Sequence, residues 1–188
     1  MKKQVRKLVS LSLVAGSLIM VSCGDSKKEN AEAEAVSHTE MEHEMHEEKE
    51  EVATAVDAEF SDAKVKQAFT QYISLKDALV GTDAAAAKEA AKQLEGTLSE
   101  NNAEISKIAG NIATTEDVNK QREMFSKLTA KLEPVFKGAI SSGKIYKQFC
   151  PMAFEGKGDS WYSTSEEIRN PYFGDKMLKC GRVEETIM

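Results

Sequence analysis

The apolar positions between residues 60 and 140 recur at helical spacing. In the first segment they are separated by three, four or seven residues, which predicts a helix with a single apolar face. These positions are Val65, Phe69, Tyr72, Ile73, Leu79 and Val80. Gly81 followed by Thr82 and Asp83 predicts the end of this helix and the cap of the next one.

Two further segments carry the same pattern. The second runs from Asp83 to Ala113, and Asn101 in the stretch SENN occupies one of its apolar positions, so we expect the helix to bend or divide there. The third begins at the cap signal TTED and contains Pro134, which is expected to kink or interrupt it. The pattern therefore predicts an all-α fold, an antiparallel bundle of three helices, or of four if the second divides.

The composition changes at Ile145, where aromatic residues and turn formers replace the Ala- and Lys-rich helices. Trp161, Tyr162, Tyr172 and Phe173 lie between turn signals at EGKGDS and NPYFG. We expect an irregular, aromatic-rich segment packed on the bundle, with Trp161 as a core residue. Together with the helices it would form one domain, residues 59–188.

The first 22 residues have the form of a lipoprotein signal peptide, with four basic residues, an apolar run from Leu8 to Val21, and a small residue before Cys23. The run is too short for a transmembrane helix, which needs about 20 apolar residues. The sequence MVSC resembles the bacterial lipobox, and this resemblance implies that Cys23 is lipidated. We expect a lipid anchor in the cell envelope, and the absence of a retention aspartate at Gly24 favours the outer membrane, facing the periplasm.

Charge and histidine content limit the possible functions. The formal net charge is −6, and removal of four basic residues with the signal peptide gives a mature chain of about −10. This argues against a nucleic-acid partner. GAISSGKI departs from the phosphate-loop pattern at Ile145, so no nucleotide site is expected. The last histidine is His46, so the folded domain cannot contain a Ser-His-Asp or Cys-His arrangement, and we expect no enzyme.

Residues 23–58 are predicted to be a disordered acidic tether. All three histidines of the protein lie there, interleaved with methionines in HTEMEHEMH. Imidazole and thioether groups suit copper. The candidate ligands are His38, Met41, His43, Met45 and His46; the alternative is a solvated spacer without a metal role.

The C-terminal segment contains CPMAF and then GKGDSWYSTSEEIRNPYFGDKMLKCG. This signature resembles the domain of unknown function 3347, whose pattern also occurs on periplasmic adaptor subunits of copper and silver efflux pumps. The resemblance implies a metal-efflux context and points at Cys150, Met152, Met177 and Cys180. Two thiolates and two thioethers form a soft ligand set suited to a copper or silver ion. For Arg169 we favour a structural role, as a carboxylate partner or in the NPYFG turn.

Cys150 and Cys180 leave three possibilities open. An even number of cysteines in an exported chain favours a structural disulfide, whereas a soft-metal site or a redox-switchable pair would need the thiols. The leading hypothesis is a lipoprotein that binds copper or silver ions and passes them to an efflux adaptor protein. The alternative is a disulfide-stapled interaction module of an envelope complex, without a metal function.

Overall fold

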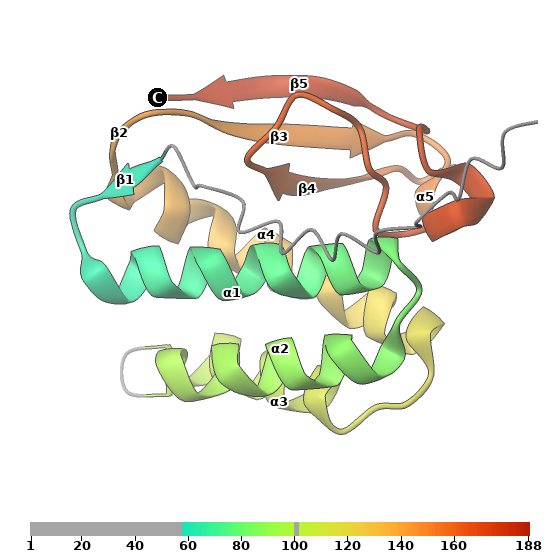
Figure 1. The fold of residues 1–188 in the computed structure, drawn as a ribbon, viewed down its shortest axis with the longest axis horizontal. Coiled ribbons are helices and arrows are strands. Elements are labelled where there is room, and N and C mark those ends of the chain that lie inside the picture. Colours follow the sequence, from blue (N-terminus) through green and yellow to red (C-terminus); the bar gives the residue numbers. More distant parts are fainter. Residues whose placement is uncertain (1–57, 100–101) are drawn as a thin grey trace, which may run out of the picture. The chain divides into compact units, whose positions relative to one another are not determined.

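The computed structural model describes residues 58–99 and 102–188. Four long helices follow one another along the chain: α1 (Ala63–Val80), α2 (Ala84–Leu98), α3 (Ala103–Ala113) and α4 (Val118–Ala139). In Figure 1, α2 and α3 form the layer farthest from the sheet, and α1 and α4 lie between that layer and the strands. The four-helix version of the bundle therefore describes the helical part.

Local signals set the helix ends as expected. The side chain of Asp83 accepts hydrogen bonds from the amides of Ala85 and Ala86 and caps α2, while Gly81 ends α1. Asp117, in the stretch TTED, caps α4 in the same way. Helix α2 ends just before SENN and α3 begins just after it. Pro134 does not interrupt α4, which continues to Ala139.

The prediction of an all-α fold is wrong, because the chain also forms two antiparallel sheets. The first pairs β1 (Glu59–Phe60) with β2 (Ile140–Ser142). The second has the order β4-β3-β5, with β3 (Ile145–Cys150) in the centre, β4 (Asp159–Ser163) on one side and β5 (Arg182–Ile187) on the other. Short elements α5 (Ala153–Gly156) and η1 (Gly174–Met177) lie in the connections.

Strand β4 was not predicted because side chains of other elements cover both of its sides. Trp161 and Tyr162 point to opposite sides of the strand, and both are fully buried. The Tyr162 ring packs against Tyr72 and Phe136 of the helices, whereas Trp161 packs against Tyr172 from the connection between β4 and β5. A strand buried on both sides loses the alternation of apolar and polar residues by which it is recognised.

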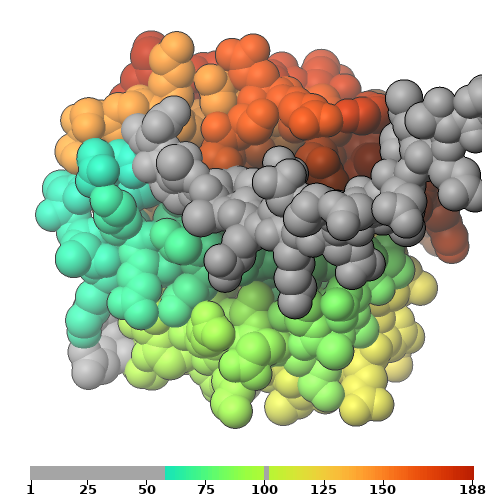
Figure 2. Space-filling view, in the orientation of Figure 1, coloured from blue at the N-terminus to red at the C-terminus, as the bar shows by residue number. Residues whose placement is uncertain are grey.

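Strand β4 joins the two layers. It is the strand of its sheet nearest the helices in Figure 1, and it contacts α4. In Figure 2 the C-terminal strands, coloured orange to red, lie at the opposite end of the view from α2, coloured light green. No helix in the described ranges is both long enough and apolar enough to cross a membrane.

Candidate functional site

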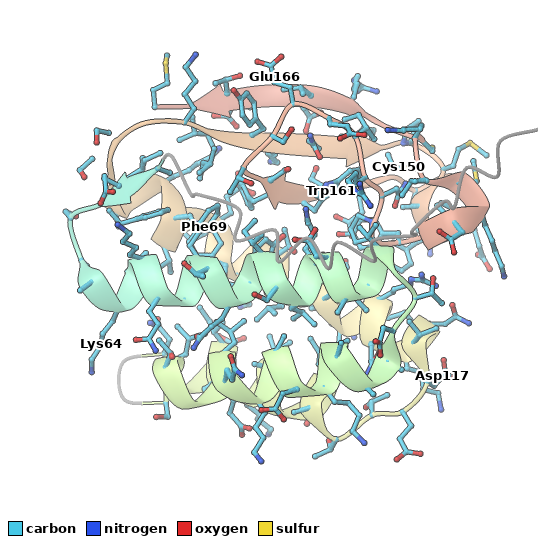
Figure 3. All side chains as sticks on the ribbon, viewed as in Figure 1. Lys64, Phe69, Asp117, Cys150, Trp161 and Glu166 are labelled. Carbon is cyan, nitrogen blue, oxygen red and sulfur yellow. The ribbon has the colours of Figure 1, made fainter. Side chains whose placement is uncertain are left out.

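Two thiols meet at the end of the three-stranded sheet. Cys150 is the last residue of β3 and is fully buried, and Cys180 lies two residues before β5. Strands β3 and β5 pair antiparallel, with Phe149 opposite Arg182. This pairing brings together two cysteines that are 30 positions apart in the sequence. Their sulfur atoms are 2.8 Å apart and both thiols are free. Figure 3 labels Cys150 at the end of β3.

The contact with Cys150 changes the acidity of Cys180. The hydrogen bond between the two thiols, followed by burial, raises the pKa of the Cys180 thiol above its ordinary value. A hydrogen bond from the backbone amide of Met152 to the Cys180 sulfur opposes this rise. Cys180 is half-buried, so of the two sulfurs it is the one closer to solvent.

The two candidate methionine ligands lie in the same two segments as the thiols. Met152 precedes α5 and is 53% exposed, and Met177 ends η1 and is 36% exposed. The amide of Cys180 donates to the Met177 carbonyl at 3.0 Å. The fold thus brings the two thiols into contact, and it leaves exposed the two methionines that lie two residues after Cys150 and three residues before Cys180.

The other candidate residues belong to the N-terminal part of the chain. Cys23, His38, Met41, His43, Met45 and His46 lie outside the described residues. Within residues 58–99 and 102–188, no group of three or more His, Cys, Asp or Glu side chains is arranged to share a metal ion.

The turn that follows Cys150 has an unusual backbone. Phe154, Glu155 and Gly156 have φ angles of 49°, 62° and 82°, so three successive residues are left-handed. This conformation costs a residue with a side chain about 1–2 kcal/mol. The Phe154 ring packs against Tyr172 at 5.1 Å, and buried Ala153 anchors the start of the turn. These contacts hold the strained turn and tie it to the segment that carries Cys180.

A hydrogen-bonded pair of buried side chains supports the strands beneath the thiols. Gln148 and Trp161 are opposite each other in β3 and β4, and the Trp161 Nε1 donates to the Gln148 Oε1 at 2.7 Å. The Gln148 amide donates in turn to the carbonyls of Ser165 and Glu167. The core role predicted for Trp161 agrees with its burial, whereas no sequence pattern indicated that Gln148 would be buried.

The NPYFG turn is held by an arginine from a distant part of the chain. Arg169 is exposed, whereas Arg122 of α4 donates through Nε to the Pro171 carbonyl at 2.8 Å. Asn170 is fully buried and donates to the Cys180 carbonyl, also at 2.8 Å. Sequence reasoning missed both Arg122 and Asn170. The one signal in the sequence was a polar asparagine directly before the proline and the aromatic residues of NPYFG.

A surface groove borders the strained turn. It has a volume of about 860 Å³ and lies between α4 and the residues from Phe154 to Asp159. A smaller hollow of about 200 Å³ shares part of its lining and extends to Arg122, Tyr172 and Phe173. The lining of the groove combines the aromatic ring of Phe154 with charges of both signs, among them Glu123, Lys127 and Lys157.

The helical part of the chain matches a known family. Residues 68–143 match the model of a family described as a protein of unknown function, DUF3347. The matched region begins within α1 and ends after β2, so it contains part of α1 and all of α2, α3 and α4, but neither Cys150 nor Cys180. The family is the one that the C-terminal signature resembles, although the matched residues are those of the bundle. Comparisons with curated proteins and with solved structures gave no match.

Proposed function

We propose that this protein binds a soft monovalent metal ion, Cu(I) or Ag(I), as cargo at the pair formed by Cys150 and Cys180. The observation that carries the proposal is the convergence of the two sulfur atoms at 2.8 Å from segments 30 residues apart. Thiolate and thioether ligands select Cu(I) over harder ions. Met152 and Met177 supply thioethers in the same two segments.

Metal binding requires two changes at the pair. A metal ion displaces the thiol protons, so binding competes with the hydrogen bond that raises the pKa of Cys180. Metal–sulfur bonds are about 2.3 Å long for zinc thiolates, a useful guide here. If the two sulfurs stayed 2.8 Å apart, the S–metal–S angle would be acute. The sulfurs of Cys150 and Cys180 must therefore move apart when a metal ion binds. Cys180, which precedes β5 and is half-buried, is the residue that we expect to move.

The cellular setting in this proposal comes from the sequence. A lipid on Cys23 would anchor the protein in the cell envelope, on the periplasmic face of the outer membrane. The histidines and methionines between His38 and His46 would capture ions weakly and deliver them to the thiol pair. An efflux adaptor protein would be the acceptor, and no catalytic turnover is involved.

One observation favours a second function. A separation of 2.8 Å is closer to the S–S distance of about 2.05 Å in a disulfide bond than to the spacing of two thiolates on one metal. An oxidised pair would staple the end of the sheet and make the domain a rigid interaction module. In that case the groove beside α4 would be the surface to test for a partner in an envelope complex.

Competition for Cu(I) tests the first function. The full-length protein is purified without oxygen and titrated with Cu(I) against a chromogenic chelator of known affinity. We expect one tightly bound ion, and a loss of affinity of at least about 100-fold in Cys150→Ser and Cys180→Ser, since even changes to residues that only support the ligands of a metal site cost about 10–100-fold. Met152→Leu and Met177→Leu should weaken binding, while Met188→Leu, which removes an exposed methionine elsewhere, is the matched control.

The outcomes separate the hypotheses. Unchanged Cu(I) affinity in the double variant Cys150→Ser/Cys180→Ser would rule out the thiol site. A protein isolated two hydrogens lighter, without copper uptake, would favour the disulfide-stapled module. Replacement of His38, His43 and His46 by alanine tests the tether; a copper occupancy equal to that of the wild type would exclude its capture role.

A further inference from the structure

The smaller hollow beside the strained turn is lined by three aromatic rings. Phe154, Tyr172 and Phe173 border it, and the rings of Phe154 and Tyr172 pack edge to face with their centroids 5.1 Å apart. The Tyr172 hydroxyl donates to the Ser160 carbonyl at 2.6 Å, so the fold fixes this wall. Pockets for small molecules have volumes of about 300–1,000 Å³, whereas the hollow has about 200 Å³. It therefore fits one long side chain better than a whole small molecule.

The charges at the hollow favour a cation. Glu123 of α4 and Glu155 of the turn line it, and neither takes part in an ion pair within residues 58–99 and 102–188. Arg122 lines the hollow as well, but its guanidinium donates to neutral acceptors of the fold. These are the carbonyls of Pro171 and Leu79, the Thr82 hydroxyl and the side-chain oxygen of Asn119. Two carboxylates against one guanidinium leave the hollow negatively charged.

The turn brings two neighbouring side chains to the hollow at a cost in backbone strain. Phe154 and Glu155 are two of the three residues other than glycine with a positive φ in the described ranges, and both line the hollow. At the end of the turn, no Cβ would fit between the backbone of Gly158 and the Phe149 ring. Strain of this kind persists where the surroundings impose it, and it is concentrated at sites that clamp ligands. The turn thus presents a preformed surface.

The larger groove continues from the hollow along α4. Lys127, Lys157 and Asp159 line the groove but not the hollow, so the far end carries two ammonium groups against one carboxylate. Both cavities include Asn119, and α4 rises about 12 Å from there to Lys127. An extended chain covers this distance with about four residues. The two cavities therefore suit a short peptide segment whose ends differ in charge.

We propose that this surface binds an extended segment of a partner protein, with an arginine or lysine side chain in the hollow and an acidic residue about four positions away. The basic side chain lies on the Phe154 ring in a cation–π contact and pairs with Glu123 and Glu155. The acidic residue lies beside Lys127 and Lys157. Peptide binding here goes beyond metal binding, gives the groove a class of ligand, and does not depend on the state of the thiols.

A synthetic peptide tests the proposal. The fluorescein-labelled probe Ser-Arg-Ser-Ser-Ser-Glu-Ser is titrated with the full-length protein, and its affinity is measured by fluorescence anisotropy in the presence of a chelator. We expect it to bind about tenfold more tightly than a peptide with norleucine in place of arginine, from one ion pair and one cation–π contact. The affinity should fall as NaCl is added. NMR shifts of backbone amides should map the peptide to residues 154–159.

Substitutions at the hollow separate the anchor from general stickiness. Glu123→Gln and Glu155→Gln should each weaken binding of the arginine peptide about two- to fivefold, as for partly exposed ion pairs, and leave the norleucine peptide unchanged. Phe154→Leu keeps an apolar side chain but removes the π face, and should have an effect of similar size. Glu89→Gln, which removes an exposed carboxylate of α2, is the matched control and should change nothing.

Equal affinity for the arginine and norleucine peptides would overturn the proposal, as would wild-type affinity in the double variant Glu123→Gln/Glu155→Gln. The competing occupant is the same chain, because Lys27, Lys28 and Lys49 precede the described residues. Replacing these three lysines by glutamine should not alter peptide affinity; a clear gain would assign the hollow to the N-terminal part of the chain instead of a partner. The chelator keeps copper out of this assay, so peptide binding and Cu(I) binding succeed or fail separately.

Discussion

At the residue scale, Gly174 of the NPYFG turn lies close against the helical bundle. Its φ is +57°, and a Cβ there would lie 2.8 Å from Arg122 Nη2 and 2.9 Å from the Val80 carbonyl oxygen. Gly174→Ala should lower the free energy of unfolding by about 2–4 kcal/mol, from left-handed strain and overpacking. Urea unfolding measures this loss.

The matched control is Gly138→Ala. Gly138 lies inside α4, and no neighbouring atom comes within 4 Å of the place that a Cβ would occupy, so alanine should be neutral or raise stability by up to about 1 kcal/mol. If the two substitutions had equal effects, the close contact between the turn and Arg122 would be contradicted.

The residues of the candidate site differ in how far the sequence reveals them. Cys150, Cys180 and Trp161 stand out by residue type, and the structure brings the two thiols together and buries the indole. Arg122 does not stand out, because it lies among other charges on α4 and the pattern gives no register between α4 and a turn 49 residues later. Arg169, for which the sequence favoured a structural role in the NPYFG turn, is exposed instead.

At the element scale, the sequence reveals the helices better than the strands. The helix caps are local, since Asp83 and Asp117 accept from amides two and three residues away. The strands depend on distant partners: β5 pairs with β3 across the whole C-terminal connection, and buried Gln148 interrupts the apolar pattern of β3. Sequence reasoning therefore recovered the bundle and missed the sheet.

A charged cluster links α4 to that sheet. The Glu133 carboxylate contacts Lys137 at 2.9 Å and Lys147 of β3 at 3.1 Å, and Lys137 also pairs with Glu185 of β5. Burial tends to raise the pKa of Glu133, but hydrogen bonds from the two lysines outweigh it and lower the pKa below its ordinary value. The ionised cluster therefore favours the folded state.

The lowered pKa of Glu133 determines how the cluster responds to pH. A carboxyl whose pKa is lower in the folded state contributes its full stability above the unfolded-state pKa, and loses it as the pH falls through the folded-state value. Glu133→Gln should cost at most about 1 kcal/mol near pH 7, since the cluster is partly exposed, and the difference from wild type should shrink toward pH 3. Urea unfolding between pH 3 and 7 measures it.

Glu104→Gln provides the comparison. Glu104 pairs with Lys131 at 2.8 Å, but its side chain is 70% exposed, so its removal should change stability little at any pH. A constant difference between wild type and Glu133→Gln across this pH range would contradict the role of the cluster.

At the scale of the whole molecule, one aromatic cluster joins the helices to the sheet. The rings of Phe69, Tyr72 and Phe136 pack together, and both Tyr72 and Phe136 contact Tyr162 of β4. The Tyr72 hydroxyl also accepts from the Tyr162 amide at 3.1 Å. The bundle and the sheet thus share a single core, and a change at the thiols acts on a fold that we expect to unfold as one unit.

Oxidation of the thiols should therefore stabilise the whole domain while removing its metal site. A bond between Cys150 and Cys180 would close a loop of about 31 residues, worth about 3–4 kcal/mol by the chain-entropy estimate. Oxidised wild-type protein should unfold at higher urea concentration than the reduced form, and should lose its Cu(I) affinity. The double variant Cys150→Ser/Cys180→Ser should show no difference between the two conditions. If the oxidised protein retained full Cu(I) affinity, the ions would bind elsewhere, because a disulfide offers no thiolate to them.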